Sequence, residues 1–365
     1  MEFIRVEDCC EILDSQRKPV TESERIPGMY PYYGANGMQG TINKYIFDDK
    51  LVLVAEDGGH FGSKTKPIAY LVNCKCWVNN HAHVLRAKKG FLAEYICYSL
   101  MFYKIEGYIN GATRQKLTQA ALRKLIIPKR SEEYQKAIVD RLDLLKCIIK
   151  NKQIIIKELD QLIKSRFVEL FGDVVLNTLN WPLVKLSDIA EYRIGLTYKP
   201  EAVSSSGIAV LRSGNIKNSQ LCYEDTIYVN SKVESKLLLK KHDILMCARN
   251  GSQSLVGKVA LIENDISNTT YGAFMMAISS KYYVYLLEYF RSQAFRRLIS
   301  VGATTTINQV TTRMLNSIVI PLPDMDTINR FALYHSQINK LKSDVQKSID
   351  ETQLLMDSLM QEYFG

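Results

Sequence analysis

Two stretches of the chain, GATRQKLTQAALRKLIIPK (Gly111–Lys129) and GATTTINQVTTRMLNSIVIPLP (Gly302–Pro323), are nearly the same. At a constant offset of 193 residues, the matched pairs are Leu117 with Val310, Thr118 with Thr311, Leu122 with Leu315, Ile127 with Ile320 and Pro128 with Pro321. The offset continues without a gap to Phe171-Gly172 and Phe364-Gly365. Each copy is therefore followed by a run of the same length, which indicates an internal duplication.

The segments upstream of each motif match more loosely. VEDCCE (Val6–Glu11) resembles LSDIAE (Leu186–Glu191), and LVLVAEDGG and DILMCARNG both suggest an apolar strand that enters a glycine turn. Asn36 is matched with Asn215 on the same reasoning. We therefore expect similar scaffolds with different loops, in four segments: folded units over 1–128 and 173–321, and helices over 129–172 and 322–365.

Both helical runs carry an apolar stripe at alternating spacings of three and four residues, interrupted in the first run at Lys152 and Arg166. Ile148, Ile155 and Leu162 widen the stripe beyond a two-stranded seam. A helix of 40 residues is about 60 Å long, so we expect the two helices to bury their stripes against each other; the alternative is a helix that lies across its own domain. The predicted helix–helix and subunit interface comprises Ile138, Leu142, Leu145, Ile149, Ile156, Leu159, Ile163, Phe331, Ile338, Val345, Ile349, Met356 and Leu359.

The basic excess lies outside these helices. The chain has a formal charge of +9 and a pI near 9.0, and the residues outside 131–170 and 324–364 include 35 basic against 24 acidic side chains. This balance favours a polyanionic partner. Eight cysteines without CxxC spacing and no signal-like N-terminus indicate reduced thiols and a cytoplasmic location.

Two patterns could indicate a bound ligand. GSQSLVGKV (Gly251–Val259) resembles a phosphate loop, but it has five residues between its glycines and valine after its lysine. His81 and His83 share one face of a predicted strand and could hold a metal, yet the second copy has no equivalent. We favour ordinary hydrogen-bonded or base-facing histidines, and expect no metal and no cofactor bound by this chain.

Asp225, Glu234 and Lys236 could be assembled into a nuclease motif, but such spacings arise readily by chance, and the first copy lacks them. The sequence contains no amino-methyltransferase motif, no GxGxxG-like loop and no visibly activated nucleophile. It therefore predicts no catalytic residue.

Loops that mix basic, amide and aromatic side chains are the remaining candidates. Arg, Lys, Asn and Gln match the edges of guanine and adenine, while lysines and hydroxyls hold phosphates; the alternative is a solvated loop. The DNA-binding candidates are Lys18, Tyr33, Asn36, Lys64, Lys66, Arg114 and Lys116 in the first copy, and Tyr198, Lys199, Arg212, Asn215, Lys217, Arg249, Asn250, Ser252, Gln253, Thr305 and Asn308 in the second.

Taken together, these motifs resemble the specificity subunits of type I restriction–modification systems. The second copy carries the resemblance in Trp181-Pro182-Leu183, Asp188, Gly302-Ala303-Thr304, Ile307-Asn308-Gln309 and Ile320–Pro323. The first copy departs from it, because TRQKLTQ is two residues shorter, Lys129 replaces the last proline, and the initial tryptophan is missing.

The resemblance implies an α+β chain of two mixed α/β target-recognition domains, separated by an antiparallel coiled coil and related by a pseudo-twofold axis. It implies that each domain reads one half of a bipartite double-stranded DNA site, and that the helices set the spacer and dock two methyltransferase subunits. The methyltransferase subunits would use S-adenosylmethionine, and the restriction subunits ATP and Mg. Three alternatives stay open: a specificity subunit whose partner fuses modification and cleavage, a DNA-modifying enzyme, and a scaffold that does not read DNA.

Overall fold

The computed structural model describes residues 2–111, 115–301 and 308–365. The predicted DNA contacts Arg114 and Thr305 lie outside these ranges, as do Gly302-Ala303-Thr304 and Ile307. Contacts divide the chain into unit 1, Met1–Ile154 with Gln346–Gly365, and unit 2, Ile155–Val345. Each long helix, α4 (Glu132–Phe171) and α9 (Met325–Phe364), therefore contributes a segment to both units.

Unit 1 is built on a six-stranded sheet in the order β2-β7-β5-β6-β3-β4, in which only β3 and β6 run parallel. The strands are β2 (Cys10–Ile12), β3 (Tyr30–Gly34), β4 (Gly37–Ile42), β5 (Phe47–Ala55), β6 (Ala69–Val78) and β7 (Ala82–Ala87). Along β5, Val52 and Val54 belong to the core cluster that contains α2 and the long helices, whereas Leu51 and Leu53 belong to the opposite one. This alternation is what a strand buried on both faces requires.

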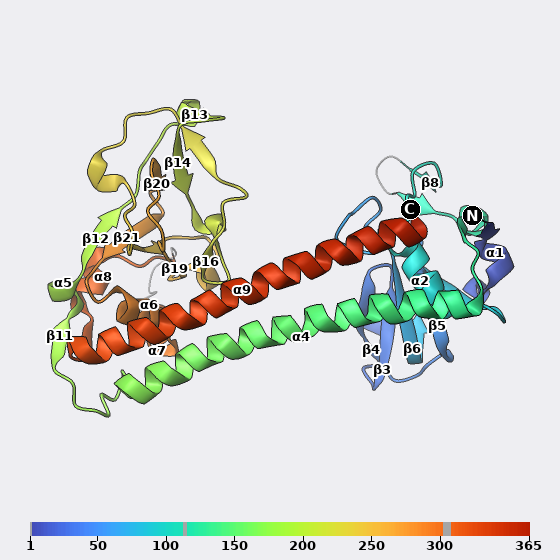
Figure 1. Ribbon diagram of the computed structural model, residues 1–365, viewed down its shortest axis with the longest axis horizontal. Coiled ribbons are helices and arrows are strands. Elements are labelled where there is room, and N and C mark those ends of the chain that lie inside the picture. Colours follow the sequence, from blue (N-terminus) through green and yellow to red (C-terminus); the bar gives the residue numbers. More distant parts are fainter. Residues whose placement is uncertain (1, 112–114, 302–307) are drawn as a thin grey trace. The chain divides into compact units, whose positions relative to one another are not determined.

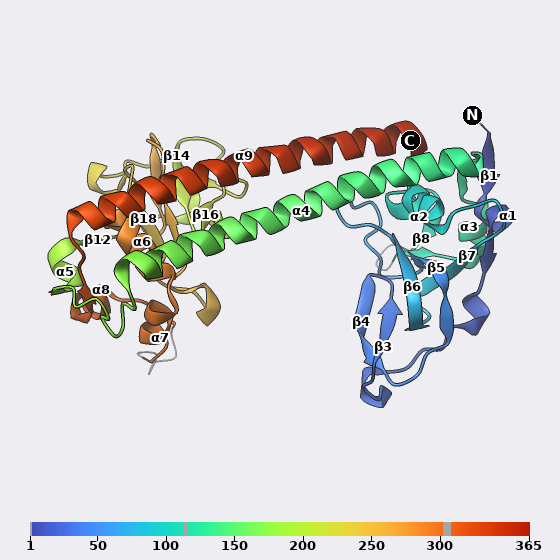
Figure 2. The ribbon, with the colours of Figure 1, turned by 60° about the horizontal axis from the view of Figure 1, so that its bottom comes forward.

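Shorter elements complete unit 1 (Figures 1 and 2). They are β1 (Phe3–Arg5), β8 (Ile109–Asn110), β9 (Lys116–Leu117), β10 (Ile126–Pro128), α1 (Val6–Cys9), α2 (Ala93–Met101), α3 (Gln119–Lys124) and the 3-10 turns η1 (Asp14–Gln16) and η2 (Glu22–Glu24). Helix α2 packs against β5 and β6 and faces α4 (Figure 2), where the Tyr98 hydroxyl donates to Asp143 Oδ1 at 2.5 Å. The six-stranded sheet is thereby attached to the long helices through α2.

Unit 2 has two four-stranded sheets, in the orders β12-β21-β18-β19 and β13-β17-β14-β20. Their strands are β12 (Glu191–Ile194), β13 (Val203–Ser204), β14 (Ile208–Leu211), β17 (Ile227–Val229), β18 (Ile244–Cys247), β19 (Val259–Leu261), β20 (Thr269–Tyr271) and β21 (Met275–Ser279). Along β18, Leu245 and Cys247 lie in a core with residues of β14 and β20, and Ile244 and Met246 face α6 and the long helices.

The rest of unit 2 consists of short elements (Figure 1). They are β11 (Leu183–Lys185), β15 (Ile216–Lys217), β16 (Gln220–Leu221), β22 (Val319–Pro321), α5 (Leu186–Ile189), α6 (Tyr283–Arg291), α7 (Gln293–Val301), α8 (Thr312–Ser317), η3 (Pro200–Ala202), η4 (Ser213–Asn215), η5 (Ser235–Leu237) and η6 (Gln253–Leu255). The expectation of similar scaffolds with different loops was thus too simple, because the sheets of the two units also differ.

The two units share the segment that precedes each long helix. We call this segment the base of the unit; it consists of a two-stranded ladder and a tyrosine that bonds to it. An antiparallel ladder pairs β1 with β10 and β11 with β22, and it ends at the equivalent prolines. The Tyr95 hydroxyl donates to the carbonyl of Pro128 at 2.8 Å, and the Tyr285 hydroxyl donates to that of Pro321 at 2.5 Å. The duplication predicted from the sequence is therefore present in the hydrogen bonds as well as in the residues.

The stripes of α4 and α9 are packed within each unit, and every predicted interface residue is buried or half-buried. In unit 1, Lys152 interrupts the stripe and donates to Ser348 Oγ at 2.6 Å and Thr352 Oγ1 at 3.1 Å. In unit 2, Phe331 meets Phe167 with ring centroids 5.6 Å apart. In both units residue numbers rise along one helix as they fall along the other, so the paired segments are antiparallel. No helix within the described ranges is long and apolar enough to cross a membrane.

Candidate nucleic-acid interface

A repeated backbone frame presents loops in both units. After the central buried strand, Asp57 forms an isolated antiparallel bridge with Lys116 in unit 1, and Arg249 forms the same bridge with Gln309 in unit 2. One residue further on, Leu117 N donates to Glu56 O at 2.8 Å, and Val310 N donates to Ala248 O at 2.7 Å. The loop that follows the strand is therefore tied, in each unit, to the segment that precedes the capped helix α3 or α8.

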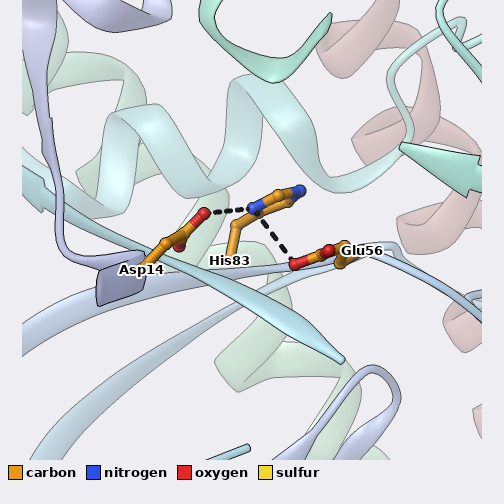
Figure 3. A group of neighbouring side chains, drawn as sticks. All are labelled: Asp14, Glu56 and His83. Carbon is orange, nitrogen blue, oxygen red and sulfur yellow. Dashed lines mark hydrogen bonds and ion pairs between the residues drawn. The ribbon is translucent and has the colours of Figure 1, made fainter. Parts of the chain in front are cut away.

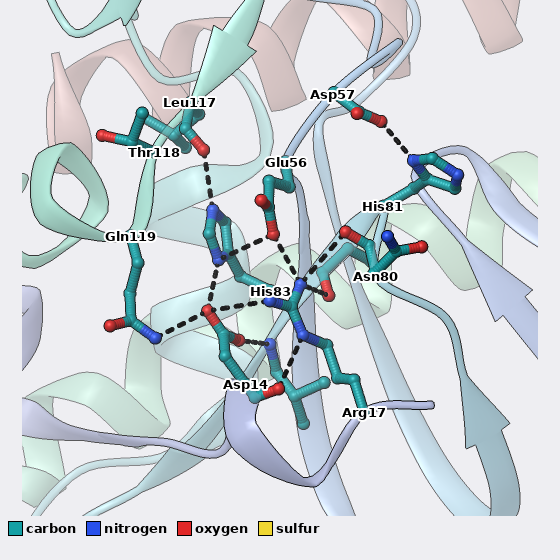
Figure 4. Close-up of polar contacts among 12 residues, drawn as sticks. Asp14, Arg17, Glu56, Asp57, Asn80, His81, His83, Leu117, Thr118 and Gln119 are labelled. Carbon is teal, nitrogen blue, oxygen red and sulfur yellow. Dashed lines mark hydrogen bonds and ion pairs between the residues drawn. The ribbon is translucent and has the colours of Figure 1, made fainter. Parts of the chain in front are cut away.

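In unit 1 this frame carries a cluster of charged and amide side chains (Figure 4). Glu56 accepts from Arg17 NH1 at 2.6 Å and pairs with Lys116 Nζ at 3.0 Å. Asn36 Nδ2, from the turn between β3 and β4, donates to the carbonyl of Gly58 at 2.9 Å. Of the predicted contacts, Asn36 and Lys116 are thus brought together around the turn at 56–58.

Behind that turn lies a buried network centred on His83, which has no exposed surface (Figure 3). His83 Nδ1 lies 2.6 Å from Asp14 Oδ2, and Nε2 lies 2.8 Å from the carbonyl oxygen of Leu117. A backbone carbonyl oxygen can only accept, so His83 Nε2 donates to Leu117. Asp14 also accepts from Gln119 Nε2 at 3.0 Å, so the network holds the Leu117–Gln119 segment against the sheet.

Charge balance explains the carboxylates of this network. Burial alone would raise the pKa of the Asp14 carboxyl, but the hydrogen bond and the charge of His83 hold that pKa below its ordinary value. Asp14, Glu56 and His83 offer ligand atoms within 4.8 Å of one another, a spacing that could suit a metal ion. Arg17 and Lys116 already pair with these carboxylates, so the cluster serves as a structural ion-pair network.

The other predicted contacts of unit 1 lie at its surface. Lys18, Lys64 and Lys66 are exposed, and the carbonyl of Lys18 accepts from Trp77 Nε1 at 2.6 Å. Tyr33 is half-buried against Tyr70, with ring centroids 5.9 Å apart. Desolvation raises the pKa of Tyr33 to about 12, so its hydroxyl stays protonated and can donate a hydrogen bond.

In unit 2 the frame gathers amide and hydroxyl side chains around Arg249. Asn250 Nδ2 donates to Ser213 Oγ at 3.2 Å, next to the exposed Arg212, and Asn308 Nδ2 donates to the carbonyl of Gly251 at 3.3 Å. Asn250 Oδ1 accepts from the backbone of Ser252 at 2.9 Å. Three loops that are distant in sequence therefore present Arg212, Arg249, Asn250, Ser252 and Asn308 together, while Gln253 follows in η6.

Two more candidates, Tyr198 and Lys199, follow a bridge between Leu196 and Gly272, and Lys199 is exposed. Lys217 lies instead on β15, where it pairs with Glu224 Oε2 at 2.9 Å. That bond lowers the pKa of Glu224 and raises the pKa of Lys217, so both remain charged.

The assignment of Asn215 to DNA contact is corrected by its position. Asn215 is 1% exposed; its Oδ1 accepts from the backbone of Arg212 at 2.8 Å, and its Nδ2 donates to the carbonyl of Cys222 at 2.9 Å. Both ends of the amide are therefore used to fold the turn. Asn36 is exposed by contrast, so the two asparagines matched by sequence have different structural roles.

Sequence reasoning did not single out Arg17, Asp14 or Phe274. Arg17 directly precedes the candidate Lys18, and Asp14 lies shortly before it, but their partners Glu56 and His83 are 39 and 69 residues away. No local sequence pattern indicates these pairs. Phe274 lies in an apolar stretch, three residues after Tyr271. Its only local signal is the preceding Gly272, which is typical of a turn.

The long helices also expose apolar side chains that their pairing leaves uncovered. In unit 1 these are Leu144, Ile154, Leu354 and Leu355, and in unit 2 they include Ile155, Leu162, Leu333 and Leu341. These side chains are 42–71% exposed.

Comparison with known proteins agrees with this architecture. The type I restriction modification DNA specificity domain family matches residues 1–161 and 179–355. A protein named as a type I restriction enzyme specificity subunit from Haemophilus influenzae is 26% identical over 273 residues, which cover 73% of this chain and 69% of that protein.

Two solved structures share the fold. The S subunit of a type I restriction–modification system from M. genitalium aligns over 100% of this chain and 96% of its own, with 15% identity and a TM-score of 0.59. A chain from a study of complex assembly and conformational transition of the type I system aligns over 100% and 97%, with 15% identity and a TM-score of 0.57. The duplicated α+β units, the two long helices and the family match over most of the sequence agree: this chain belongs to the type I restriction modification DNA specificity domain family.

Proposed function

We propose that this chain is the DNA-reading subunit of a type I restriction–modification complex, in which each unit reads one half of a bipartite double-stranded site. The observation that carries the proposal is the repeated frame with different side chains. The bridge that holds Asp57 and Lys116 in unit 1 holds Arg249 and Gln309 in unit 2. The same backbone frame therefore presents different side chains in the two units. This is what a protein that recognises two different DNA sequences needs.

The proposal assigns no chemistry to the chain itself. Its acidic and histidine cluster is neutralised by Arg17 and Lys116, and its family is defined by specificity subunits. Modification of adenine would be performed by two methyltransferase subunits with S-adenosylmethionine, and cleavage by restriction subunits with ATP and Mg. The exposed leucines and isoleucines of α4 and α9 are the surface on which we propose that the methyltransferase subunits dock.

The reading roles can be tested by mapping methylated adenines in cells that carry the complex with and without this chain. Arg249→Ala is expected to relax one half of the recognised site by about 1–3 kcal/mol at the affected base, because a good bidentate base contact contributes that much. Asn250→Ala is expected to relax the same half by loosening the loop that its amide holds together. Lys236→Ala, an exposed charge removal in the same unit, is the matched control and should leave both halves unchanged. Equal weakening on all DNA would identify Arg249 and Asn250 as phosphate contacts instead.

We also propose that α4 and α9 set the spacer between the two half-sites. Each is a continuous helix of 40 residues, and half-sites one turn of DNA apart are separated by about 34–36 Å. Removing one heptad from both helices shortens each by about 10 Å, so the tolerated spacer should shorten by about three base pairs while both half-sites stay the same. An unchanged spacer would refute this part of the proposal.

A further inference from the structure

One aromatic side chain of unit 2 stands out from its surroundings. Phe274 is 60% exposed, whereas Tyr271 and Met275, on either side of the turn between β20 and β21, are 0% and 1% exposed. Burying a phenylalanine ring stabilises a fold, and the exposed ring of Phe274 contributes little of that stabilisation. Single exposed apolar residues are common on protein surfaces, so the argument depends on how Phe274 is held and on what lies beside it.

The backbone fixes Phe274 directly beside the candidate base-reading loop. Its carbonyl accepts hydrogen bonds from Ala248 N at 2.9 Å and Arg249 N at 3.0 Å, and Gly272 N donates to the carbonyl of Leu211 at 2.9 Å. The Arg249 guanidinium lies over the aromatic ring at 5.4 Å from its centroid. Stacking on an aromatic face restricts the guanidinium fork, so the ring and the charge form one preorganised pair.

We infer that Phe274 is a specificity-determining residue of unit 2, whose ring packs on the 5-methyl group of a thymine in the half-site that this unit reads. The inference rests on the proposed function. Among the base edges in the major groove, the thymine methyl is the apolar group, and phenylalanine is one of the side chains that contact it. Stacked base pairs are about 3.4 Å apart, so a guanidinium 5.4 Å from the ring reaches the same base pair or its neighbour.

Thymine-to-uracil replacement tests this contact, because it removes the methyl group and leaves every hydrogen-bonding group of the base in place. The full chain, assembled with its methyltransferase subunits, is titrated at fixed salt with duplexes in which each half-site thymine is replaced in turn by deoxyuridine. The unaltered chain should lose about fourfold in affinity at one thymine of one half-site, which corresponds to burial of one methyl group. The thymines of the other half-site should be insensitive to Phe274.

Two substitutions link that loss to the side chain. Phe274→Ala should bind the thymine duplex about fourfold or more weakly, and should show no further loss when the sensitive thymine becomes uracil. Phe274→Leu, which keeps an apolar contact, should retain most of the discrimination between thymine and uracil. Because Phe274 is mostly exposed, both variants are expected to fold.

Several outcomes would overturn the inference. One is a loss of affinity below twofold when any half-site thymine is replaced by uracil. A second is a loss of the same size in Phe274→Ala as in the unaltered chain. A third is that Phe274→Ala no longer binds the methyltransferase subunits but still discriminates between DNA sequences, which would make Phe274 a protein contact. An unaltered complex that distinguishes no DNA sequence would overturn the proposed function as well. Retained selectivity without any methyl effect would overturn this inference alone.

Discussion

Replacing Asp14 by asparagine should destabilise unit 1 by about 3 kcal/mol, the lower end of the range for removing one partner of a buried ion pair. Asp14 is 7% exposed. It accepts from Val84 N at 2.9 Å, His83 Nδ1 at 2.6 Å and Gln119 Nε2 at 3.0 Å, and it pairs with Arg17 NH2 at 3.5 Å. The asparagine would keep one acceptor oxygen, but its amide nitrogen would face groups that themselves donate.

The same substitution should flatten the dependence of stability on pH. The native network holds the pKa of Asp14 below the ordinary value of 3.8, despite the opposing effect of burial. The unfolded chain therefore takes up the proton first, and the stability that Asp14 contributes is complete well above pH 3.8 and is lost as the pH falls through the lowered native pKa. Asparagine has no proton to take up, so the difference between the two proteins should shrink in acid.

The two tryptophans make unit 1 separately observable. Trp77 lies on β6 of unit 1, where it donates to the carbonyl of Lys18 at 2.6 Å, and Trp181 lies in unit 2. In a Trp181→Phe background, urea unfolding followed by tryptophan fluorescence reports on unit 1 through Trp77. Titrations of the Asp14→Asn variant and its parent at neutral pH give the difference in unfolding free energy, and the same pair repeated at pH values that fall below 3.8, the ordinary pKa of aspartate, gives its pH dependence.

Asp48→Asn is the matched control, because Asp48 is an aspartate of the same unit that is 58% exposed and lies 3.7 Å from Lys75 Nζ. An exposed pair of this kind contributes about 0–1 kcal/mol, so the control should change the unfolding free energy by about 0.5 kcal/mol or less. If Asp14→Asn cost no more than Asp48→Asn, or if its pH dependence matched that of the parent, the buried network would not stabilise unit 1.

Because the base is repeated, Tyr95→Phe should lower the unfolding free energy of unit 1 by about 1 kcal/mol, and Tyr285→Phe that of unit 2 by a similar amount. Each substitution removes one buried hydrogen bond to a proline carbonyl. Urea denaturation of each unit measures the two losses. Phe331→Ala should destabilise unit 2 by about 3–5 kcal/mol, since this fully buried ring meets Phe167 and Phe171; a smaller shift in the urea midpoint would mean that the helices do not close the core. Lys152→Ala should cost unit 1 about 1–2 kcal/mol through its bonds to α9, with the exposed Lys150→Ala as a silent comparison.

The sequence predicts the helices and the duplication because both depend on local periodicity and on spacing. The stripe from Ile138 to Ile163 is read from intervals of three and four residues, and those side chains are buried or half-buried. Even the interruption at Lys152 is visible in the sequence. Its partners, Ser348 and Thr352, are not, because they lie almost two hundred residues away and no periodic signal joins them.

The sheets and the polar networks could not be predicted in the same way. Asn36 and Asn215 both follow a glycine-rich pattern, yet one side chain bonds across a turn at the surface and the other is enclosed by its own loop. The histidine pair illustrates a partial success. His83 is an ordinary hydrogen-bonded core residue, as favoured from the sequence, but only the fold brings Asp14 and Leu117 to its two nitrogens.

A physical reason connects the duplicated frame to two different specificities. The bonds that close the frame, Leu117 N to Glu56 O and Val310 N to Ala248 O, join backbone atoms. They are therefore indifferent to the side chains at those positions, and equivalent sites can carry an acidic residue in unit 1, at Asp57, and a basic residue in unit 2, at Arg249. The base of each unit is held by a tyrosine and a strand ladder that do not involve the loops. Backbone hydrogen bonds stabilise the frame, whereas side chains determine what it can bind. The surface side chains of one unit can therefore change without unfolding that unit.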